Sequence, residues 1–208
     1  MTLQQTPPRT PTPTWVRAGL LALGFVALLW LLEAIDAASG NDLDHLGIRP
    51  RSGEGLLGVL FAPLLHFGWG HLESNTIPAL MLAFLVLVSG IGRGLAATAV
   101  IWIVSGLGVW LVSPGNSITA GASVLIFGWL VYLMVRGVFS RRIGQILLGV
   151  ILLVGYGGLL LGVLPGQPGV SWQGHLFGAI GGAIAAWLLA DDAEDRATRR
   201  GPQAFSRP

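Results

Sequence analysis

Four polar side chains interrupt long apolar stretches of this sequence: His71, Asn75, Ser123 and His175. The chain contains no cysteine, so a side chain that attacks a carbonyl group in acyl transfer must do so through oxygen. A serine hydroxyl becomes a good nucleophile when a neighbouring base takes its proton, and neutral imidazole does this near neutral pH. Because "SWQGHLFGAIGG" around His175 holds no Asp or Glu, we expect Ser123 and His175 to act as a catalytic dyad.

Acyl transfer also needs hydrogen-bond donors for the oxygen that becomes negative in the transition state. The candidates for this oxyanion site are the backbone N–H of Ser123, the amide of Asn75 and the imidazole of His71. His71 and Asn75 lie four residues apart, which places them on one face of a helix. Losing one such donor typically lowers the rate ~100- to 1,000-fold.

Helical spacing also predicts which residues lie next to Ser123 and His175. Phe127 follows Ser123 by four residues, so its ring is predicted one helical turn below the serine, where it can pack against the base. His175, Gly178 and Gly182 share another helix face, and small residues let the backbones of membrane helices approach closely. We therefore expect the helix that carries His175 to press against the helix that carries Ser123.

The composition indicates that membrane helices position these residues. Hydrophobic residues make up 53% of the 208 and charged residues 11%, and the mean hydropathy is +0.71. Such a chain is far more apolar than a soluble domain of this length. The basic residues are 12 arginines against 10 acidic residues, so the pI near 9.9 does not indicate a nucleic-acid partner. No cofactor or metal site is predicted.

Six segments approach the roughly 20 apolar residues that a helix needs to cross a bilayer. They run from Trp15 to Ile35, His71 to Ser89, Leu95 to Val112, Gly121 to Val138, Ile143 to Leu164 and Trp172 to Ala190. The sequence thus predicts an all-α integral membrane protein with one six-helix domain over residues 15–190. Residues 1–14, rich in Pro and Thr, and the charged residues 191–208 are expected to be disordered tails. A cleaved signal peptide in place of the first span is disfavoured by the length of its apolar stretch.

The arginines are distributed unevenly between the two sides of these spans. One side has all of them except Arg49 and Arg51, which lie in the long loop over residues 36–70. The positive-inside rule therefore places both termini in the cytoplasm of a multi-pass plasma-membrane protein. The second, fourth and sixth spans then begin in the outer leaflet, where the four polar residues would meet in a site that faces outward.

Three motifs at the starts of these alternate spans resemble the signatures of the rhomboid family of intramembrane serine proteases. "HLESN" matches H-x-x-x-N, "GASV" matches G-x-S-x and "GHLFGAIGG" matches H-x-x-G-x-x-x-G. The order and the spacing also fit, and the resemblance covers about residues 15–190. It implies a bacterial, six-helix rhomboid-like bundle that cleaves transmembrane segments of other membrane proteins within the lipid bilayer.

The resemblance also assigns roles to residues. It implies that Ser123 is the nucleophile, that His175 is its general base, and that His71 and Asn75 form the oxyanion site with the Ser123 amide. It further implies that Gly121 lets the chain approach the substrate.

Two further residues match positions of the family without being expected to react. Phe127 occupies a position that is often aromatic, frequently Tyr. His66 matches a recurrent histidine, which is expected to support the start of the second span. No cofactor is expected for this chain, and its sequence carries no signal of an oligomeric state.

Two features depart from the family pattern. Val124 follows the serine where many members have Gly, and we expect it to crowd the oxyanion site or to narrow the choice of substrate. A Trp-Arg pair common in the first long loop is absent, and "LGIRPRSGEG" stands there instead. The detailed structure of that loop is therefore not predicted by the resemblance.

Several alternatives stay open. Ser123 alone fits ordinary helix packing, and His71 with Asn75 fits a polar helix start at the lipid boundary. An inactive rhomboid-like protein that binds or escorts membrane proteins is the main alternative function, favoured only by Val124. A transporter is disfavoured because no inverted repeat occurs. A metal site of His66, His71 and His175 is disfavoured because no carboxylate has useful spacing.

Overall fold

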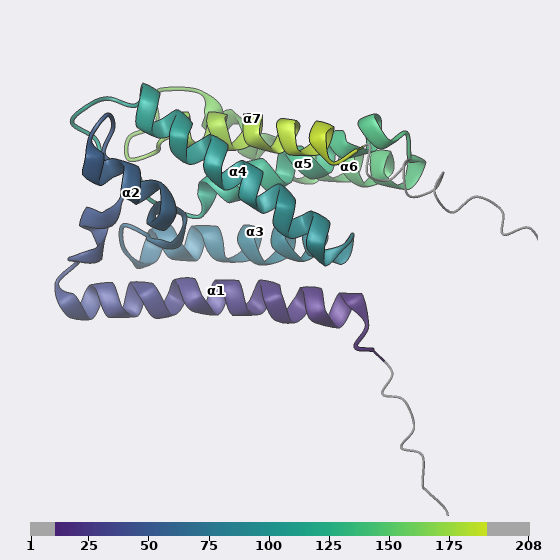
Figure 1. Ribbon diagram of the computed structural model, residues 1–208, viewed down its shortest axis with the longest axis horizontal. Helices are drawn as coiled ribbons and strands as arrows, with labels where there is room; N and C mark the ends of the chain where they lie inside the picture. The colour runs from purple at the N-terminus through teal and green to yellow at the C-terminus, as the bar shows by residue number, and fades with distance from the viewer. Residues whose placement is uncertain (1–10, 191–208) are drawn as a thin grey trace, which may run out of the picture.

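The computed structural model describes residues 11–190, which form a bundle of helices (Figure 1). The helices are α1 (Thr14–Ser39), α2 (Gly53–Phe61), α3 (Trp69–Val88), α4 (Ile91–Val112), α5 (Ser123–Ser140), α6 (Ile143–Tyr156) and α7 (Trp172–Leu188), with short 3₁₀ segments η1 (Leu43–Leu46), η2 (Ala62–Leu64) and η3 (Gly157–Val163). All six predicted spans correspond to helices. The predicted tails lie outside the described residues, except for residues 11–14.

The long helices alternate in direction, so the beginning of α1 and the end of α7 lie at the same end of the bundle (Figure 1). Within residues 11–190, five segments are long and apolar enough to cross a membrane: α1, α3, α4, α5, and α6 together with η3. Helix α7 has 17 residues, or about 25 Å at a rise of 1.5 Å per residue. The helical membrane architecture is thus confirmed, whereas the six-span count stays a prediction.

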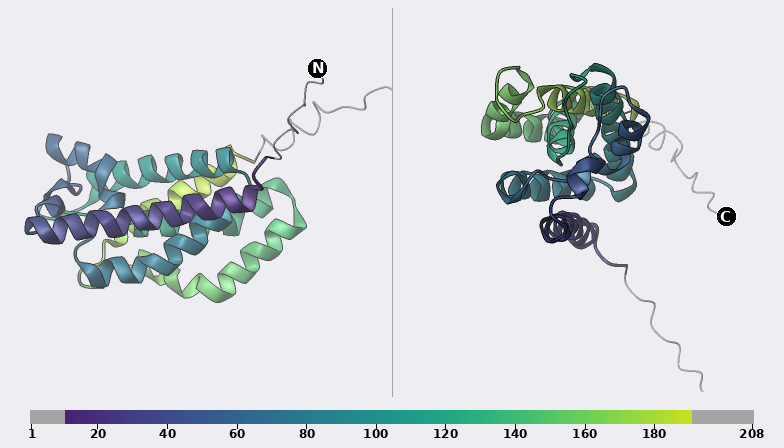
Figure 2. Two further views of the ribbon diagram at one scale, coloured as in Figure 1. Left: turned by 90° about the horizontal axis from the view of Figure 1, so that it is seen from below. Right: turned by 90° about the vertical axis from the view of Figure 1, so that its left-hand side faces the viewer.

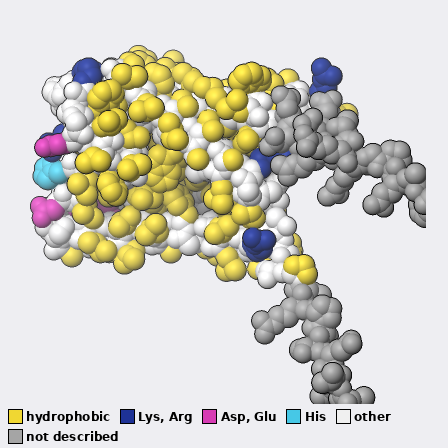
Figure 3. Space-filling view, in the orientation of Figure 1, with side chains coloured by type: hydrophobic (Ala, Val, Ile, Leu, Met, Phe, Trp, Pro, Cys, Tyr) yellow, Lys and Arg dark blue, Asp and Glu magenta, His cyan; other side chains and the backbone are white. Residues whose placement is uncertain are grey.

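The surface supports this architecture. Figure 3 shows hydrophobic side chains over most of the visible face, with the coloured charged side chains gathered towards its two ends. Large apolar residues such as Leu23, Leu147 and Val154 are exposed on the sides of the bundle. An apolar belt between two charged ends is the surface that a bilayer requires.

Helix α5 is the most deeply buried of the long helices, because α3, α4, α6 and α7 all pack against it. Its contact with α7 depends on glycine. A Cβ atom at Gly178 would overlap the carbonyl oxygen of Val124, and one at Gly182 would overlap that of Gly128. The two helices therefore pack backbone against backbone, which brings the start of α7 to the start of α5.

The loop over residues 36–70 contains a helix that hydropathy did not reveal. Helix α2 has nine residues, too few to cross a membrane, and it packs against α4. The indole of Trp102 donates to the Val59 carbonyl at 2.8 Å, and that of Trp110 donates to the Ser52 carbonyl at 2.9 Å. These bonds fix the loop onto the bundle.

Helix α1 lies at the edge of the bundle and packs mainly against α3 (Figure 2). Its buried residues form one stripe: Ala18, Ala22, Val26, Leu29, Glu33 and Asp36. The last two are acidic, and each is only 3% exposed. Asp36 is buried because its Oδ1 accepts a 2.7 Å hydrogen bond from the Leu43 N–H.

Candidate active site

Ser123 and His175 lie in direct contact at the N-terminal ends of α5 and α7. The Ser123 Oγ lies 3.0 Å from Nε2 of His175, and the other ring nitrogen, Nδ1, lies 3.0 Å from the carbonyl oxygen of Gly162. A carbonyl oxygen can only accept, so Nδ1 carries the ring proton and Nε2 accepts from the serine hydroxyl. This is the tautomer that a general base needs.

Gly162, in η3, was not identified from the sequence. A Cβ there would lie 3.0 Å from Nδ1 of His175 and 2.8 Å from Cζ of Phe127, so a side chain would displace one of these rings. The carbonyl of Gly162 takes the place of the carboxylate that a triad would supply. Many glycines surround it in "GYGGLLLGV", and nothing in that pattern distinguishes this one.

The ring of Phe127 stacks on the imidazole of His175. The ring centroids are 3.9 Å apart and the planes differ by 11°. Phe127 comes from the second turn of α5, one turn below Ser123. Together with the Gly162 carbonyl, this contact fixes both the position and the rotation of the imidazole.

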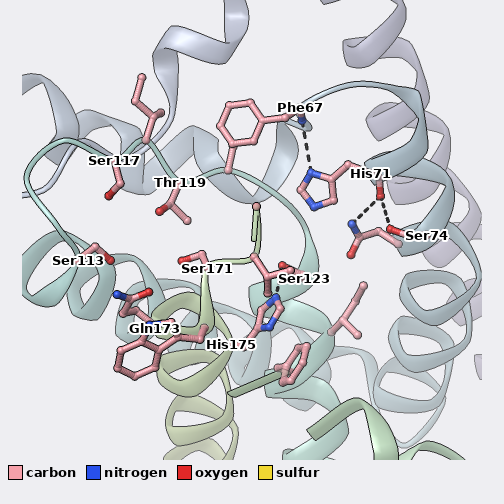
Figure 4. Close-up of a pocket in the computed structure, with 18 of the residues that line it drawn as sticks. Phe67, His71, Ser74, Ser113, Ser117, Thr119, Ser123, Ser171, Gln173 and His175 are labelled. Carbon is pink, nitrogen blue, oxygen red and sulfur yellow. Dashed lines mark hydrogen bonds between the residues drawn. The ribbon is translucent and has the colours of Figure 1, made fainter. Parts of the chain in front are cut away.

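The other side of Ser123 faces His71, which lies in the first turn of α3 (Figure 4). A Cβ at Gly121 would lie 2.9 Å from Nε2 of His71 and 3.6 Å from the Ser123 Oγ. Gly121 also has φ of +130°, a conformation that L side chains rarely adopt. Glycine at this position therefore lets the His71 ring reach the serine.

The hydrogen bonding of His71 leaves the Nε2 atom of its ring as a hydrogen-bond donor. The Phe67 N–H points at Nδ1 of His71 over 3.4 Å, so Nδ1 accepts and Nε2 carries the proton. Ser123 is the first residue of α5, where backbone N–H groups have no partner within the helix. The Ser123 N–H and the His71 Nε2–H can thus both donate to an oxygen bound beside the serine.

Asn75 lines the same cavity one turn further along α3 and is 5% exposed. Its Nδ2 donates one hydrogen to the His71 carbonyl at 2.8 Å. The second amide hydrogen remains for a bound group, because a carboxamide carries two.

His66 lies behind the site and is only 2% exposed. Its Nε2 accepts from the Ala122 N–H at 3.4 Å, and the rings of His66 and His71 meet edge to face with centroids 5.0 Å apart. Burial, with a smaller contribution from His71, lowers the pKa of His66 to about 3, so the ring is neutral at physiological pH. His66 thereby holds Ala122, the residue before Ser123, in place.

Val124 does not crowd the oxyanion site. Its side chain is 7% exposed, is not part of the cavity wall, and lies against α7. A Cβ at Gly174 would lie 3.0 Å from its Cγ1, so the missing side chain of Gly174 leaves room for the valine. The expectation that Val124 crowds the oxyanion site is therefore wrong.

A cavity of about 660 Å³ opens beside Ser123 and is lined from α3, from the segment before α5, and from the start of α7. Among its wall residues the titratable side chains are His71 and His175, and no Asp, Glu, Lys or Arg is present. In the described part of the chain, no three His, Asp or Glu side chains are grouped to hold a metal ion. The arrangement favours nucleophilic chemistry on an uncharged, bulky substrate.

Comparison with known proteins identifies one matching family and several similar proteins. The sequence model of the Rhomboid domain matches residues 54–192. Uncharacterized protein Rv1337 of Mycobacterium tuberculosis is 52% identical, over 93% of this chain and 87% of that protein. Uncharacterized protein ML1171 of Mycobacterium leprae is 47% identical, over 89% of this chain and 76% of that protein. No solved structure matches the chain.

Proposed function

The chain belongs to the rhomboid family, and from this premise we propose that it is an intramembrane serine endopeptidase. It hydrolyses a peptide bond in or beside a transmembrane segment of another membrane protein. The proposal rests above all on one observation: the Ser123 hydroxyl lies 3.0 Å from an imidazole whose other nitrogen donates to a backbone carbonyl.

In the first half of the reaction, the Ser123 Oγ attacks the substrate carbonyl carbon while its proton passes to Nε2 of His175. The carbonyl oxygen becomes negative and accepts from the Ser123 N–H, from Nε2 of His71 and from the Asn75 amide. When the C–N bond breaks, His175 gives its proton to the departing amine. The substrate is then bound to Ser123 as an ester.

In the second half, water from the cavity attacks this ester. His175 takes one proton from the water, and the same three donors stabilise the second tetrahedral intermediate. The C–O bond to Ser123 then breaks, and the Ser123 Oγ regains a proton from His175. The carboxylic acid product leaves and loses its remaining proton to water. No carboxylate of the enzyme takes part.

The substrate must unwind before it can react. A transmembrane helix uses its carbonyl groups in backbone hydrogen bonds, so the scissile carbonyl is inaccessible until that helix opens locally. Segments that contain Gly, Pro or other small residues open more easily. These segments are the favoured substrates.

We place both termini in the cytoplasm and the site towards the outside. The support is the arginine distribution together with the alternating helix directions, which bring the two described ends of the chain to one side (Figure 1). In this topology α7 is the sixth span, and the dyad and its cavity lie at the opposite, outer end of the bundle.

The test is cleavage of a panel of transmembrane substrates by the full chain in liposomes. Ser123→Ala and His175→Ala are each expected to lower cleavage by more than about 1,000-fold. Ser105→Ala and His45→Ala serve as matched controls, because Ser105 is buried in α4 away from the cavity and His45 is exposed in η1.

Labelling of Ser123 by a fluorophosphonate gives a second readout that needs no substrate. Cleavage that survives in Ser123→Ala would overturn the proposal. Absence of both cleavage and labelling in the wild type would instead favour a protein that binds membrane partners without cutting them.

A further inference from the structure

The cavity has a second polar wall that the proposed mechanism does not use. Its members are Gln173 in the first turn of α7, Ser113 at the end of α4 and Thr119 in the segment before α5. They are 9%, 2% and 6% exposed, respectively. Figure 4 shows the Gln173 amide on the side of α7 away from His175, in the direction of Ser113.

One of these polar groups, the Ser113 hydroxyl, lacks a partner within the described residues. The Ser113 hydroxyl is buried without a hydrogen bond, and no dashed line joins the Gln173 amide to another side chain drawn in Figure 4. Buried polar groups are nearly always paired, because an unpaired one costs the free energy of its desolvation. Polar residues that line a cavity of about 660 Å³ are placed to pair with a group that enters it.

Each member of this wall sits on a fixed support. Arg51 donates to the Ser113 carbonyl at 2.8 Å, and Thr119 exchanges two backbone hydrogen bonds with Ile48 at 2.9 and 3.0 Å. Gln173 belongs to a helix start where the Ser171 hydroxyl accepts from the Gly174 N–H. The groups are therefore held in place before any ligand arrives, as a selective subsite requires.

The chemistry of the wall defines what it binds. A carboxamide and two hydroxyls offer both donors and acceptors, which complements another carboxamide or a hydroxyl. The cavity wall carries no Asp, Glu, Lys or Arg, so an ionised substrate side chain would be buried without a counter-charge. An apolar side chain would displace water and leave the polar groups unpaired.

We infer that Gln173, Thr119 and Ser113 form a substrate subsite for an uncharged, hydrogen-bonding side chain, Asn or Gln above all, near the scissile bond of the unwound segment. The inference rests on the proposed function, because it takes the cavity to be the place where a peptide segment is held. It names a substrate class: transmembrane segments that carry a neutral polar residue close to the cut.

The experiment measures binding and cleavage separately. The full-length Ser123→Ala variant is titrated with fluorescent transmembrane peptides in which one position at a time, on either side of the cut, is Asn or Leu. At one position, Asn is expected to bind about tenfold more tightly than Leu. Adding Gln173→Met, which keeps the size of the side chain but removes the amide, is expected to reduce this ratio to less than about twofold.

Gln167→Met is the matched control, because Gln167 is exposed in the loop before α7 and does not line the cavity. This variant should keep the tenfold preference. The same peptide pairs are then cut by the enzyme with Ser123 intact, where kcat/KM should show the same preference.

The two hypotheses fail in different ways. A preference for Asn in binding without any cleavage would keep the subsite and overturn the protease proposal. Cleavage without preference for a polar residue at any position, or with the same preference in Gln173→Met, would overturn the subsite and leave the protease standing.

Discussion

The two ends of α5 both carry buried polar side chains, but they differ in how those groups are satisfied. At the end away from the serine, Arg136 is 7% exposed and donates to Ser89 at 2.6 Å and to Gln145 at 3.1 Å. Ser140 also donates to Gln145 at 2.8 Å. The cavity beside them measures about 10 Å³, room for about one water molecule.

At the serine end, the same helix begins beside a cavity of about 660 Å³. There the Ser113 hydroxyl and Nδ1 of His66 have no partner within the described residues, and the N–H groups of Ser123 and Val124 make no backbone hydrogen bond. At the Arg136 end, Nε of Arg93 is also unpaired, but the other groups bond to one another around the small cavity. Such a cluster stabilises the fold, whereas polar groups left unpaired beside a large cavity await a ligand. The first kind should respond to mutation in stability, and the second in activity.

Outside the dyad, the largest effect is expected for His71→Ala. Removing one oxyanion donor should lower kcat ~100- to 1,000-fold, or about 3 to 4 kcal/mol in activation free energy. The midpoint of thermal unfolding should change little, because His71 is only partly buried and lines the cavity. Steady-state cleavage and a thermal melt on the same preparation measure both quantities. If the melting temperature of His71→Ala falls far enough to explain the lost activity, the two ends of α5 do not differ in their response to mutation.

Arg136→Met should show the opposite pattern. The variant keeps the apolar stem but loses two charge-assisted hydrogen bonds, which should cost about 2 to 3 kcal/mol of stability. Cleavage measured well below the melting temperature should stay within about twofold of wild type. Arg17→Met is the control, because Arg17 is exposed and its loss should change stability by less than about 0.5 kcal/mol. A kcat defect in folded Arg136→Met would show that both ends of α5 serve the reaction.

His66 sharpens the comparison through pH. Its pKa is about 3 in the folded protein and 6.5 without burial, so the unfolded chain binds the proton more readily. The stability due to the neutral ring is complete above pH ~6.5 and falls towards pH ~3, by about 2 kcal/mol at pH ~5. His66→Gln cannot take up this proton, and its melting temperature should fall less between pH ~7 and ~5. An equal fall in the melting temperatures of wild type and His66→Gln over this pH range would contradict the burial of a neutral His66 ring.

The smallest effect concerns the contact between Val124 and Gly174. Gly174→Ala places a methyl group against the Val124 Cγ1, which should cost about 1 kcal/mol and lower kcat about fivefold by shifting His175 relative to Ser123. Val124→Ala in the same chain should restore the rate, since it removes the overlapping carbon. If the double variant is no faster than Gly174→Ala, the valine does not set the distance between the helices.

The sequence predicts the helices better than it predicts the site. Long apolar runs place five membrane helices within a few residues, because hydropathy alone decides which segments can lie in lipid. Helix α2 was missed because a mainly apolar stretch of nine residues does not distinguish a short helix from a loop. Helix α7, with 17 residues, is shorter than the expected span.

Within the site, helical spacing places Asn75 one turn from His71 and Phe127 one turn from Ser123. The direction of the Val124 side chain and the role of the Gly162 carbonyl could not be predicted, because both depend on how α7 and η3 pack against α5. The burial of Gln173 depends in the same way on tertiary contacts that no local pattern reports.

The stripe on α1 has a consequence for how this chain can evolve. Six positions of that helix are buried against the bundle, while most of the others, including Leu20, Leu23 and Leu31, are exposed on its surface. Lipid accepts one apolar side chain about as well as another. Substitutions at these exposed positions are therefore nearly neutral as long as they stay apolar. Among related proteins, α1 should diverge faster than α5, with the stripe itself retained.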